Sequence, residues 1–438
     1  MKKDYWRVKM SKLRPREYIF SITNSGTNKL IMFLGIPIRI DRSGYYKKIC
    51  AEMPIDNNKI VIDNFNGGSY GCNPKYITEE LLKRNKNYDI VWLVKSVKKE
   101  TEKENFPEGI RLVGYGTKQG LKELASAKLW IDNQRKNYFI KKGLTKKEGQ
   151  YFIQTWHGSL GIKKLDADVE AFTNEYKQEW VERAKFDSAM WDYLLTNSEF
   201  ENKIFRRALW FNNEIKQFGH PRNDIFFKDS TQIKNKVYEF FDIPKDKKIL
   251  LYVPSFRDDG DIECYKLDYD RILKALENKF GSGWVCISRL HPRAKKFDSQ
   301  IIPEDNPHVI DGTFYPDIQE LLVSAGCAIS DYSSCIFDFM MSRKPAFIFA
   351  TDIEKFNTDR GFYYPLESTP FPIASDNETL IKNIETFDYE NYKVKTEEFI
   401  KGKGCTEDGH ASERTADLIE EIMSNRICHP ELDSGSIN

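Results

Sequence analysis

The chain has 438 residues, of which 40% are hydrophobic and 13% aromatic, and its 67 basic and 66 acidic side chains leave a formal net charge of +1. A chain of this length usually forms two or more domains, and this composition excludes a disordered protein. The charge balance gives no overall field that would attract nucleic acid. The eight cysteines include no C-x-x-C pair, so we expect reduced thiols in a cytoplasmic protein.

Residues 1–55 are predicted to be a basic N-terminal extension. Residues 1–20 carry seven Lys or Arg against Asp4 and Glu17, and a basic, aromatic segment can rest on an anionic membrane. A solvated terminus would have the same composition. The apolar run at 30–38 is about half the length of a membrane-spanning helix, so we expect a protein that is soluble or membrane-peripheral.

From residue 56 to about 235, β-branched segments alternate with helix-patterned segments. This alternation favours a first domain with a parallel sheet and helices on both faces. Strands are predicted at KIVIDNF, YDIVWLVKS, GIRLVGYG, LWIDN and YFIQTW, and helices at NPKYITEELLKRN and LKELASAK.

The same alternation continues in a second domain, predicted at 236–405. Together the two regions predict an α/β fold of two doubly wound, Rossmann-like domains that face a ligand cleft at the carboxyl ends of their strands. A last helix at 406–426 could cross back onto the first domain or stay on the second, and the tail at 427–438 is expected to fray. Strands of the second domain are predicted at 248–256, 284–290, 327–330 and 345–350.

Ionisable and hydroxyl side chains follow four of these predicted strands. A histidine titrates near neutral pH, and cations together with hydroxyls at a helix start suit a phosphate group. We therefore expect a diphosphate site at these strand ends, against the alternatives of a histidine that only packs and an ordinary serine N-cap. The residues are His157, Arg257, His291, Asp331, Ser333 and Ser334.

Other ligand signatures are missing from the sequence. There is no G-x-x-x-x-G-K-[ST] segment, so a P-loop is not expected. The six histidines have no paired spacing, so no structural metal is expected. Whether a divalent metal assists the reaction stays open.

Ten segments between residues 58 and 422 occur in an order typical of one enzyme family. They include NFNGGSYGCNP, YFIQTWHGSLGIKKL, FGHPRND, LLYVPSFRD, RLHPR, SDYSSCIFDFMMSRKPAFIF and RGFYYP. In these segments the chain resembles the CDP-glycerol glycerophosphotransferases of teichoic acid and capsule synthesis, which have a GT-B fold. The resemblance implies transfer of glycerol phosphate, or another alditol phosphate, from a CDP-alditol to a hydroxyl of a lipid-linked or polymeric saccharide. CMP is released, and no cofactor is required.

The resemblance also implies site residues, with donor binding in the second domain. We hypothesise that His157 is the general base and that His291, Arg257, Ser333 and Ser334 hold the diphosphate, with His291 stabilising the leaving CMP. Gly158 is expected to leave room for the acceptor. The full predicted set is His157 and His291 as catalytic residues and Gly158, Arg222, Ser255, Arg257, Arg289, Ser330, Asp331, Ser333, Ser334, Arg360 and Gly361 as substrate-binding residues.

Two departures from the family pattern leave the acceptor and the polyol open. His220 stands where the family often has Tyr, and Ser159 and Leu160 stand where Thr-Pro is common. The alternative functions are a GT-B glycosyltransferase that uses a nucleotide sugar for capsule or lipopolysaccharide synthesis, and a catalytically silent saccharide- or lipid-binding protein. We expect a cytoplasmic location at the inner face of the plasma membrane, with no nucleic acid partner.

Overall fold

The computed structural model of the chain describes most of its length. The predicted membrane-binding stretch at 1–19 and the predicted tail at 427–438 lie outside the described residues. Within the described part, no helix is long and apolar enough to cross a bilayer. The described residues are 20–25, 28–34, 36–41, 43–95, 103–169, 175–257, 261–281, 283–291, 294, 298–303 and 305–424.

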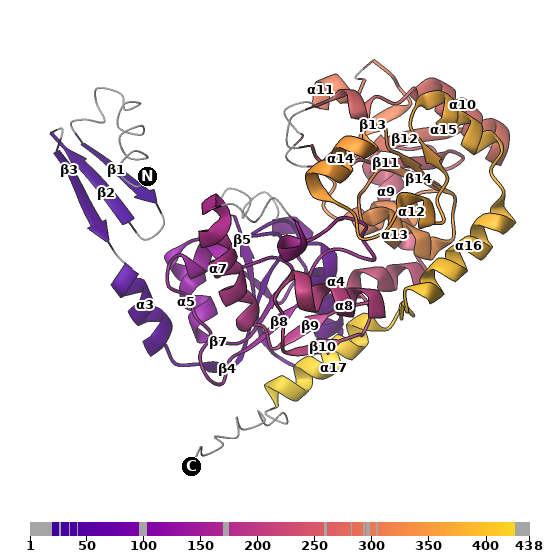
Figure 1. Cartoon of the computed structure of the whole chain (residues 1–438). Helices are drawn as coiled ribbons and strands as arrows, with labels where there is room; N and C mark the ends of the chain where they lie inside the picture. The colour runs from indigo at the N-terminus through magenta and orange to yellow at the C-terminus, as the bar shows by residue number, and fades with distance from the viewer. Residues whose placement is uncertain are drawn as a thin grey trace, which may run out of the picture.

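A small antiparallel sheet near the N-terminus stands apart from the two large domains (Figure 1). It consists of β1 (Phe20–Ser25), β2 (Asn28–Phe33) and β3 (Ile36–Asp41). The predicted extension therefore contains a folded unit, and its apolar run at 30–38 forms parts of two strands and the turn between them. Helix α3 (Ser43–Glu52) follows and packs against α5 (Lys118–Ser126) of the first domain.

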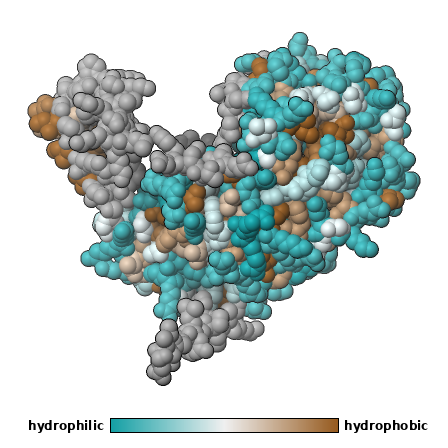
Figure 2. All heavy atoms as spheres, viewed as in Figure 1, coloured by the Kyte–Doolittle hydropathy of each residue, from teal (hydrophilic) through white to brown (hydrophobic). Residues whose placement is uncertain are grey.

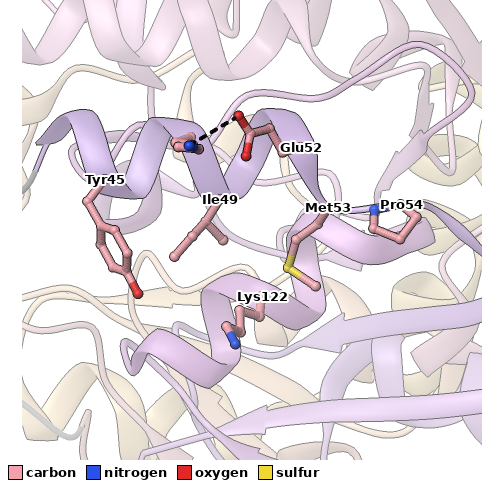
Figure 3. Close-up of a pocket in the computed structure, with 7 residues that line it drawn as sticks. Tyr45, Ile49, Glu52, Met53, Pro54 and Lys122 are labelled. Carbon is pink, nitrogen blue, oxygen red and sulfur yellow. Dashed lines mark ion pairs between the residues drawn. The ribbon is translucent and has the colours of Figure 1, made fainter.

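A shallow hollow lies where α3 meets α5 (Figure 3). Its lining includes Tyr45, Ile49, Met53 and Lys122. It also includes Pro54, which lies two residues before strand β4 begins. It therefore lies at the amino ends of the strands, on the opposite side of the sheet from the predicted cleft.

The first domain is a seven-stranded parallel sheet in the order β10-β9-β8-β7-β4-β5-β6. Its central strands are buried on both faces, as their continuous apolar runs require; Ile60, Val61 and Ile62 are fully buried. The strands are β4 (Asp56–Asp63), β5 (Asp89–Val94), β6 (Ile110–Gly114), β7 (Ala127–Asp132), β8 (Tyr151–Gln154), β9 (Tyr193–Leu195) and β10 (Glu214–Lys216). The main helices beside α5 are α4 (Cys72–Lys83), α6 (Asn137–Ile140), α7 (Glu175–Ala189) and α8 (Glu199–Ala208).

The second domain is a six-stranded parallel sheet in the order β13-β12-β11-β14-β15-β16. The predicted α/β architecture of two Rossmann-like domains is therefore confirmed. The strands are β11 (Lys248–Val253), β12 (Trp284–Ser288), β13 (Val309–Asp311), β14 (Cys327–Ser330), β15 (Ala346–Phe349) and β16 (Ile373–Ala374). The helices are α9 (Thr231–Phe240), α10 (Tyr269–Phe280), α11 (Asp298–Ile301), α12 (Ile318–Ser324), α13 (Cys335–Phe339), α14 (Ile353–Arg360), α15 (Asn377–Glu385) and α16 (Tyr389–Gly402).

The last helix, α17 (Ala411–Met423), belongs to the first domain. It packs against α4, and its Leu418, Ile419 and Ile422 share a core with Ile60 of β4. Figure 1 shows α16 running down from the second domain and α17 lying beneath the first. The chain thus crosses between the domains twice.

The geometry of the two sheets indicates where a ligand would bind. Strand β4 lies between β5 and β7, and β11 lies between β12 and β14, so the chain order reverses beside each of these strands. Open α/β sheets bind ligands outside the carboxyl ends of the strands at such reversals. The residues that follow β4, β7 and β8 in one domain and β11 and β14 in the other are the candidates.

Candidate active site

His157 follows β8 on a strained loop. Trp156, the residue before it, has a φ of 50°, which is rare for a bulky side chain and persists only where the surroundings impose it. The Trp156 N–H donates to Gln154 Oε1 at 3.0 Å, and the Thr155 N–H donates to the Asp132 carbonyl at 2.9 Å. The loop therefore holds His157 in one place.

The hydrogen bonds of the ring define its tautomer. His157 Nδ1 lies 2.6 Å from the carbonyl oxygen of Asn133, which can only accept, so Nδ1 carries the hydrogen. Nε2 then keeps its lone pair, with the amide nitrogen of Gln134 at 3.4 Å. The edge of Phe65 packs against the ring with a centroid separation of 5.3 Å. His157 is thus arranged to accept a proton at Nε2.

The segment NFNGGSYGCNP, after β4, places Phe65 beside this ring. Phe65, Asn66 and Gly67 all have positive φ, at 48°, 57° and 78°. Asn133 fastens the turn, because its side chain accepts from the Phe65 N–H at 2.8 Å and donates to Asn64 Oδ1 at 2.6 Å. The sequence alone indicated no role for this segment, and the structure shows that the segment supports His157.

The surroundings of His157 favour the neutral imidazole. Burial lowers its pKa from 6.5 to about 4, the hydrogen bond that Nδ1 donates to the Asn133 carbonyl opposes this shift, and the nearby charges of Arg222, Lys163 and His220 lower the pKa further. The ring is therefore unprotonated at neutral pH, as a general base must be.

The loop after His157 lies against the second domain. A methyl group at Gly158 would be 3.9 Å from Ser334 Oγ, and one at Gly161 would be 3.5 Å from Ser334 Cβ. Lys163 Nζ lies 3.4 Å from Ser255 Oγ. The fold thus brings the histidine loop next to two of the predicted donor-binding residues.

Ser333 and Ser334 lie partly exposed at the start of α13. Ser334 is the N-cap residue, and its side chain makes no capping hydrogen bond. Ser333 Oγ accepts from the Cys335 thiol at 3.1 Å. Both hydroxyls face the loop region and keep their predicted role as a proposal.

Ser330 and Asp331, which were predicted to contact substrate, have partners within the protein. Ser330 Oγ donates to the Val253 carbonyl at 2.6 Å, and Asp331 accepts from the Ser255 N–H at 2.8 Å. Both side chains are buried. They join the ends of β11 and β14 and so position Ser255.

Arg257 is also committed to the protein. Its Nε and Nη2 pair with Asp352 at 2.6 and 3.0 Å, and its Nη1 donates to Asp331 at 2.8 Å. The guanidinium also lies 5.1 Å from the centre of the Tyr332 ring. A direct contact with the diphosphate would require these ion pairs to break, so Arg257 is a positioning residue in this geometry.

Arg222 connects the two halves of the site rather than facing an open space. Its Nη1 donates to the carbonyl of His157 at 2.7 Å, and its Nη2 pairs with Asp338 of α13 at 2.9 Å. The side chain is buried. Arg222 therefore ties the histidine loop to the helix that begins at the serine pair, and its substrate-binding role stays a prediction.

Arg289, by contrast, has no ion-pair partner among the described residues. It donates to the carbonyls of Gly312, at 3.2 Å, and Tyr315. Burial lowers its pKa from 12.5 to about 10. A partly exposed cation without an ion-pair partner suits an anion site.

The remaining predicted residues lie around these groups. His291 follows β12, with its ring 5.6 Å from that of Phe256. Arg360 donates to the Lys164 carbonyl at 3.1 Å. Gly361 caps α14 with a φ of 79°, and a methyl group there would meet the Lys164 side chain at 2.8 Å. Gly361 thus has a backbone role, and its contact with substrate stays a prediction.

The two departures from the family pattern meet in one buried network. His220 Nε2 lies 3.0 Å from Glu201, and the other oxygen of this carboxylate accepts from the Leu160 N–H at 3.0 Å. Ser159 Oγ accepts from Asn197 at 2.9 Å. His220, Ser159 and Leu160 therefore act together to hold the loop that follows His157.

Among the described residues, no group of three or more His, Cys, Asp or Glu side chains could hold a metal ion. The residues that sequence reasoning missed are Asn133, which orients His157, and Lys163, which reaches the second domain. Neither has a distinctive signal in a single sequence beyond its place in a matched segment.

Two Rossmann-like domains with a last helix that returns to the first define a protein of the GT-B type. Residues 45–421 match the family described as CDP-Glycerol:Poly(glycerophosphate) glycerophosphotransferase. The chain belongs to this family, and the predicted resemblance is confirmed.

The relatives in this family are moderately similar. The chain is 30% identical over 389 residues to the teichoic acid poly(glycerol phosphate) polymerase of Bacillus subtilis (strain 168), which covers 85% of this chain and 50% of that protein. It is 28% identical over 387 residues to the teichoic acid glycerol-phosphate transferase of Staphylococcus aureus, covering 85% of this chain and 95% of that protein. The chain thus spans about half the length of the first relatives that it matches.

A solved structure has the same fold. The wall teichoic acid polymerase TagF, in a crystal soaked with CDPG, aligns with a TM-score of 0.75 at 28% identity and covers 88% of this chain and 94% of that one. The similarity extends over both domains.

Proposed function

We propose that this protein transfers glycerol phosphate, or another alditol phosphate, from a CDP-alditol to a hydroxyl of a lipid-linked or polymeric saccharide. The reaction releases CMP and serves the synthesis of a cell-surface polymer such as teichoic acid or capsule. One observation carries the proposal: His157 presents an unprotonated Nε2 at the face where its loop meets Ser255 and Ser334 of the second domain. The names of the relatives, a glycerol-phosphate transferase and a poly(glycerol phosphate) polymerase, support the same chemistry.

In this mechanism the acceptor oxygen attacks the phosphorus that carries the alditol. A new P–O bond forms, the bond from that phosphorus to the bridging oxygen breaks, and CMP leaves with the electron pair. His157 Nε2 takes the proton of the acceptor hydroxyl. Charge spreads over the phosphoryl oxygens in the transition state, so the protein acts by positioning and charge stabilisation. Arg289, His291, Ser333 and Ser334 supply these contacts.

CMP release tests the proposal directly. The purified protein is mixed with CDP-glycerol, CDP-ribitol or a panel of UDP-sugars, each with and without a lipid-linked saccharide. CMP from one CDP-alditol, dependent on the acceptor, is expected and also identifies the polyol. UDP release alone would assign the protein to the nucleotide-sugar glycosyltransferases instead.

The site of action in this proposal is the cytoplasmic face of the plasma membrane, through peripheral contact. The support is an exposed apolar face on the N-terminal sheet. Ile38 pairs with Ile31 and Ile36 pairs with Phe33, so these side chains share a face with Ile40. Figure 2 shows hydrophobic residues along the outer edge of this sheet, at the left. Its exposed apolar residues are 41 to 65% accessible: Ile22, Phe33, Leu34, Ile36, Ile38 and Ile40.

Sedimentation with vesicles that contain anionic lipid tests this contact. Ile36→Thr with Ile38→Thr should reduce the bound fraction, because less apolar surface enters the interface, and deletion of residues 1–20 should reduce it in a salt-dependent way. Val394→Thr is the matched control, since Val394 is 52% exposed on α16. Undiminished binding of both variants would contradict the membrane contact.

A further inference from the structure

Lys163 is a cation inside the site that lacks an acidic partner. Its Nζ lies 3.4 Å from the Ser255 hydroxyl, and no carboxylate in the described part of the chain lies within ion-pair distance. Burial lowers its pKa; the charge of Asp331 opposes this effect, whereas Arg360 and Arg257 add to it. Asp331 already pairs with Arg257 at 2.8 Å. The ammonium is therefore only partly exposed, and the carboxylate that acts on it, Asp331, is already paired.

The backbone around Lys163 is held on both sides. Lys163 forms an antiparallel bridge with Phe362. The Tyr363 N–H donates to the Ile162 carbonyl at 2.8 Å, and the Lys164 N–H donates to the Gly361 carbonyl at 3.0 Å. The side chain of Lys164 covers Gly361, whereas that of Lys163 reaches Ser255. Two adjacent lysines thus point to different places, and one of them points into the site.

We propose that Lys163 forms an ion pair with the diphosphate of the donor, from the same first-domain loop that carries His157. This inference rests on the proposed function and assigns its donor contact. Lys163 is only partly exposed, so its ammonium loses some hydration without gaining a carboxylate partner, and a diphosphate supplies the missing negative charge. The position also fits, because Lys163 meets the second domain at Ser255, beside the serine pair at the start of α13.

Donor binding then acts on His157. Three cationic groups lower the pKa of this histidine: Arg222, Lys163 and His220. Arg222 pairs with Asp338 at 2.9 Å, and His220 lies 3.0 Å from Glu201. The charge of Lys163 alone among these three has no carboxylate partner, so a bound diphosphate cancels it and makes the imidazole more basic. The base is thus stronger in the donor complex than in the free protein.

The test compares Lys163→Gln, Lys163→Arg and the control Lys164→Gln. For Lys163→Gln we expect CDP-glycerol and inorganic diphosphate to bind about 10-fold to 100-fold more weakly, the range for a hydrogen bond to a charged group, with unchanged cytidine binding. Lys163→Arg should recover most of the affinity. The acid limb of kcat/KM should move to higher pH in Lys163→Gln, because removal of a positive charge raises the pKa of His157 in the free enzyme.

Two results would overturn the inference. One is unchanged affinity for inorganic diphosphate in Lys163→Gln, and the other is an equal loss of affinity in Lys164→Gln. If the wild-type protein releases UDP from a UDP-sugar and no CMP, the proposed function fails, and titration of the same variants with that UDP-sugar still decides the role of Lys163. Thermal unfolding of Lys163→Gln should match wild type, since no ion pair is lost.

Discussion

The cationic side chains around this site fall into two groups that differ in their partners. Arg257, Arg222 and Lys136 each lie within 3 Å of a carboxylate, at 2.6 Å from Asp352, 2.9 Å from Asp338 and 2.6 Å from Asp132. Lys163 and Arg289 have only hydroxyl or carbonyl partners among the described residues.

This difference distinguishes cations that stabilise the fold from cations that are available to an anionic ligand. A paired cation keeps its partner's charge compensated, so its removal leaves a buried carboxylate and costs stability. An unpaired cation has no carboxylate partner in the free protein, and it gains a partner of opposite charge only when an anion binds. Lys163 reaches Ser255 from the loop that carries His157, and Arg289 follows the neighbouring strand β12 of the second domain. Pairing therefore distinguishes residues that build the site from residues that bind the donor.

The largest effect is expected at His157, which belongs to neither group of cations. His157→Ala should lower turnover by about 100-fold to 10,000-fold, the usual contribution of a general base, while CDP-glycerol affinity changes little. CMP release and equilibrium titration measure the two quantities. His410→Ala is the control, because His410 is exposed and is the N-cap residue of α17. Loss of donor binding with an unchanged residual rate would contradict the assignment of the base.

Removal of a paired cation should act on stability. Arg257→Gln leaves Asp331 and Asp352 without their ion-pair partner, and the expected loss is about 3 to 5 kcal/mol in the free energy of unfolding. Urea unfolding measures this change. An unfolding free energy equal to that of wild type would show that pairing does not mark the structural cations.

Removal of an unpaired cation should act on binding. Arg289→Gln is expected to weaken CDP-glycerol binding by about 10-fold to 100-fold, with an unfolding free energy close to that of wild type. The affinity for cytidine should stay the same, because it lacks the diphosphate. A variant that is destabilised but binds CDP-glycerol normally would place Arg289 with the structural cations.

The pH profile sharpens the comparison through the charges around His157. This histidine accepts a proton only when neutral, and its pKa is lowered from 6.5 to about 4 by burial first and by neighbouring cations. The acid limb of kcat/KM, which reports the free enzyme, should therefore lie near pH 4. The limb of kcat should lie at higher pH, because bound diphosphate offsets the cations. If the acid limbs of kcat/KM and of kcat both lay at the ordinary histidine value of 6.5, this account of the site would be contradicted.

The smallest effect is expected from a neutral group. Ser334→Ala should weaken donor binding by about 2-fold to 10-fold, the range for one uncharged hydrogen bond. Ser368→Ala is a control on an exposed turn, where the hydroxyl donates to the Pro365 carbonyl at 2.6 Å. Equal affinity of Ser334→Ala and wild type would remove the hydroxyl from the donor site.

The long buried strands could be predicted because their sequence pattern reflects their environment. The segments at 60–62 and 249–253 are continuous apolar runs that burial on both faces explains. The strands at 193–195, 309–311 and 373–374 were missed, since two or three residues cannot show a period. The sheet at 20–41 was missed because its apolar face is exposed rather than buried.

The site could be predicted only in part, for a similar reason. His157 was found because a ring that can titrate directly follows a strand. The pairing of Arg257 depends on Asp352, 95 residues further along the chain, and no local pattern contains this information. Lys163 resembles any loop lysine in the sequence, and its isolation from carboxylates exists only in the folded protein.

One paired measurement tests the central claim, that the unpaired cations of the site bind the donor while the paired ones hold the structure. The thermal midpoint and the CDP-glycerol dissociation constant are measured on the same preparations of wild type, Arg289→Gln and Arg257→Gln. The account predicts that Arg289→Gln unfolds at the wild-type thermal midpoint and binds CDP-glycerol more weakly. Arg257→Gln should unfold at a lower thermal midpoint. The opposite pattern, a destabilised Arg289→Gln that binds normally and a stable Arg257→Gln that does not bind, would contradict it.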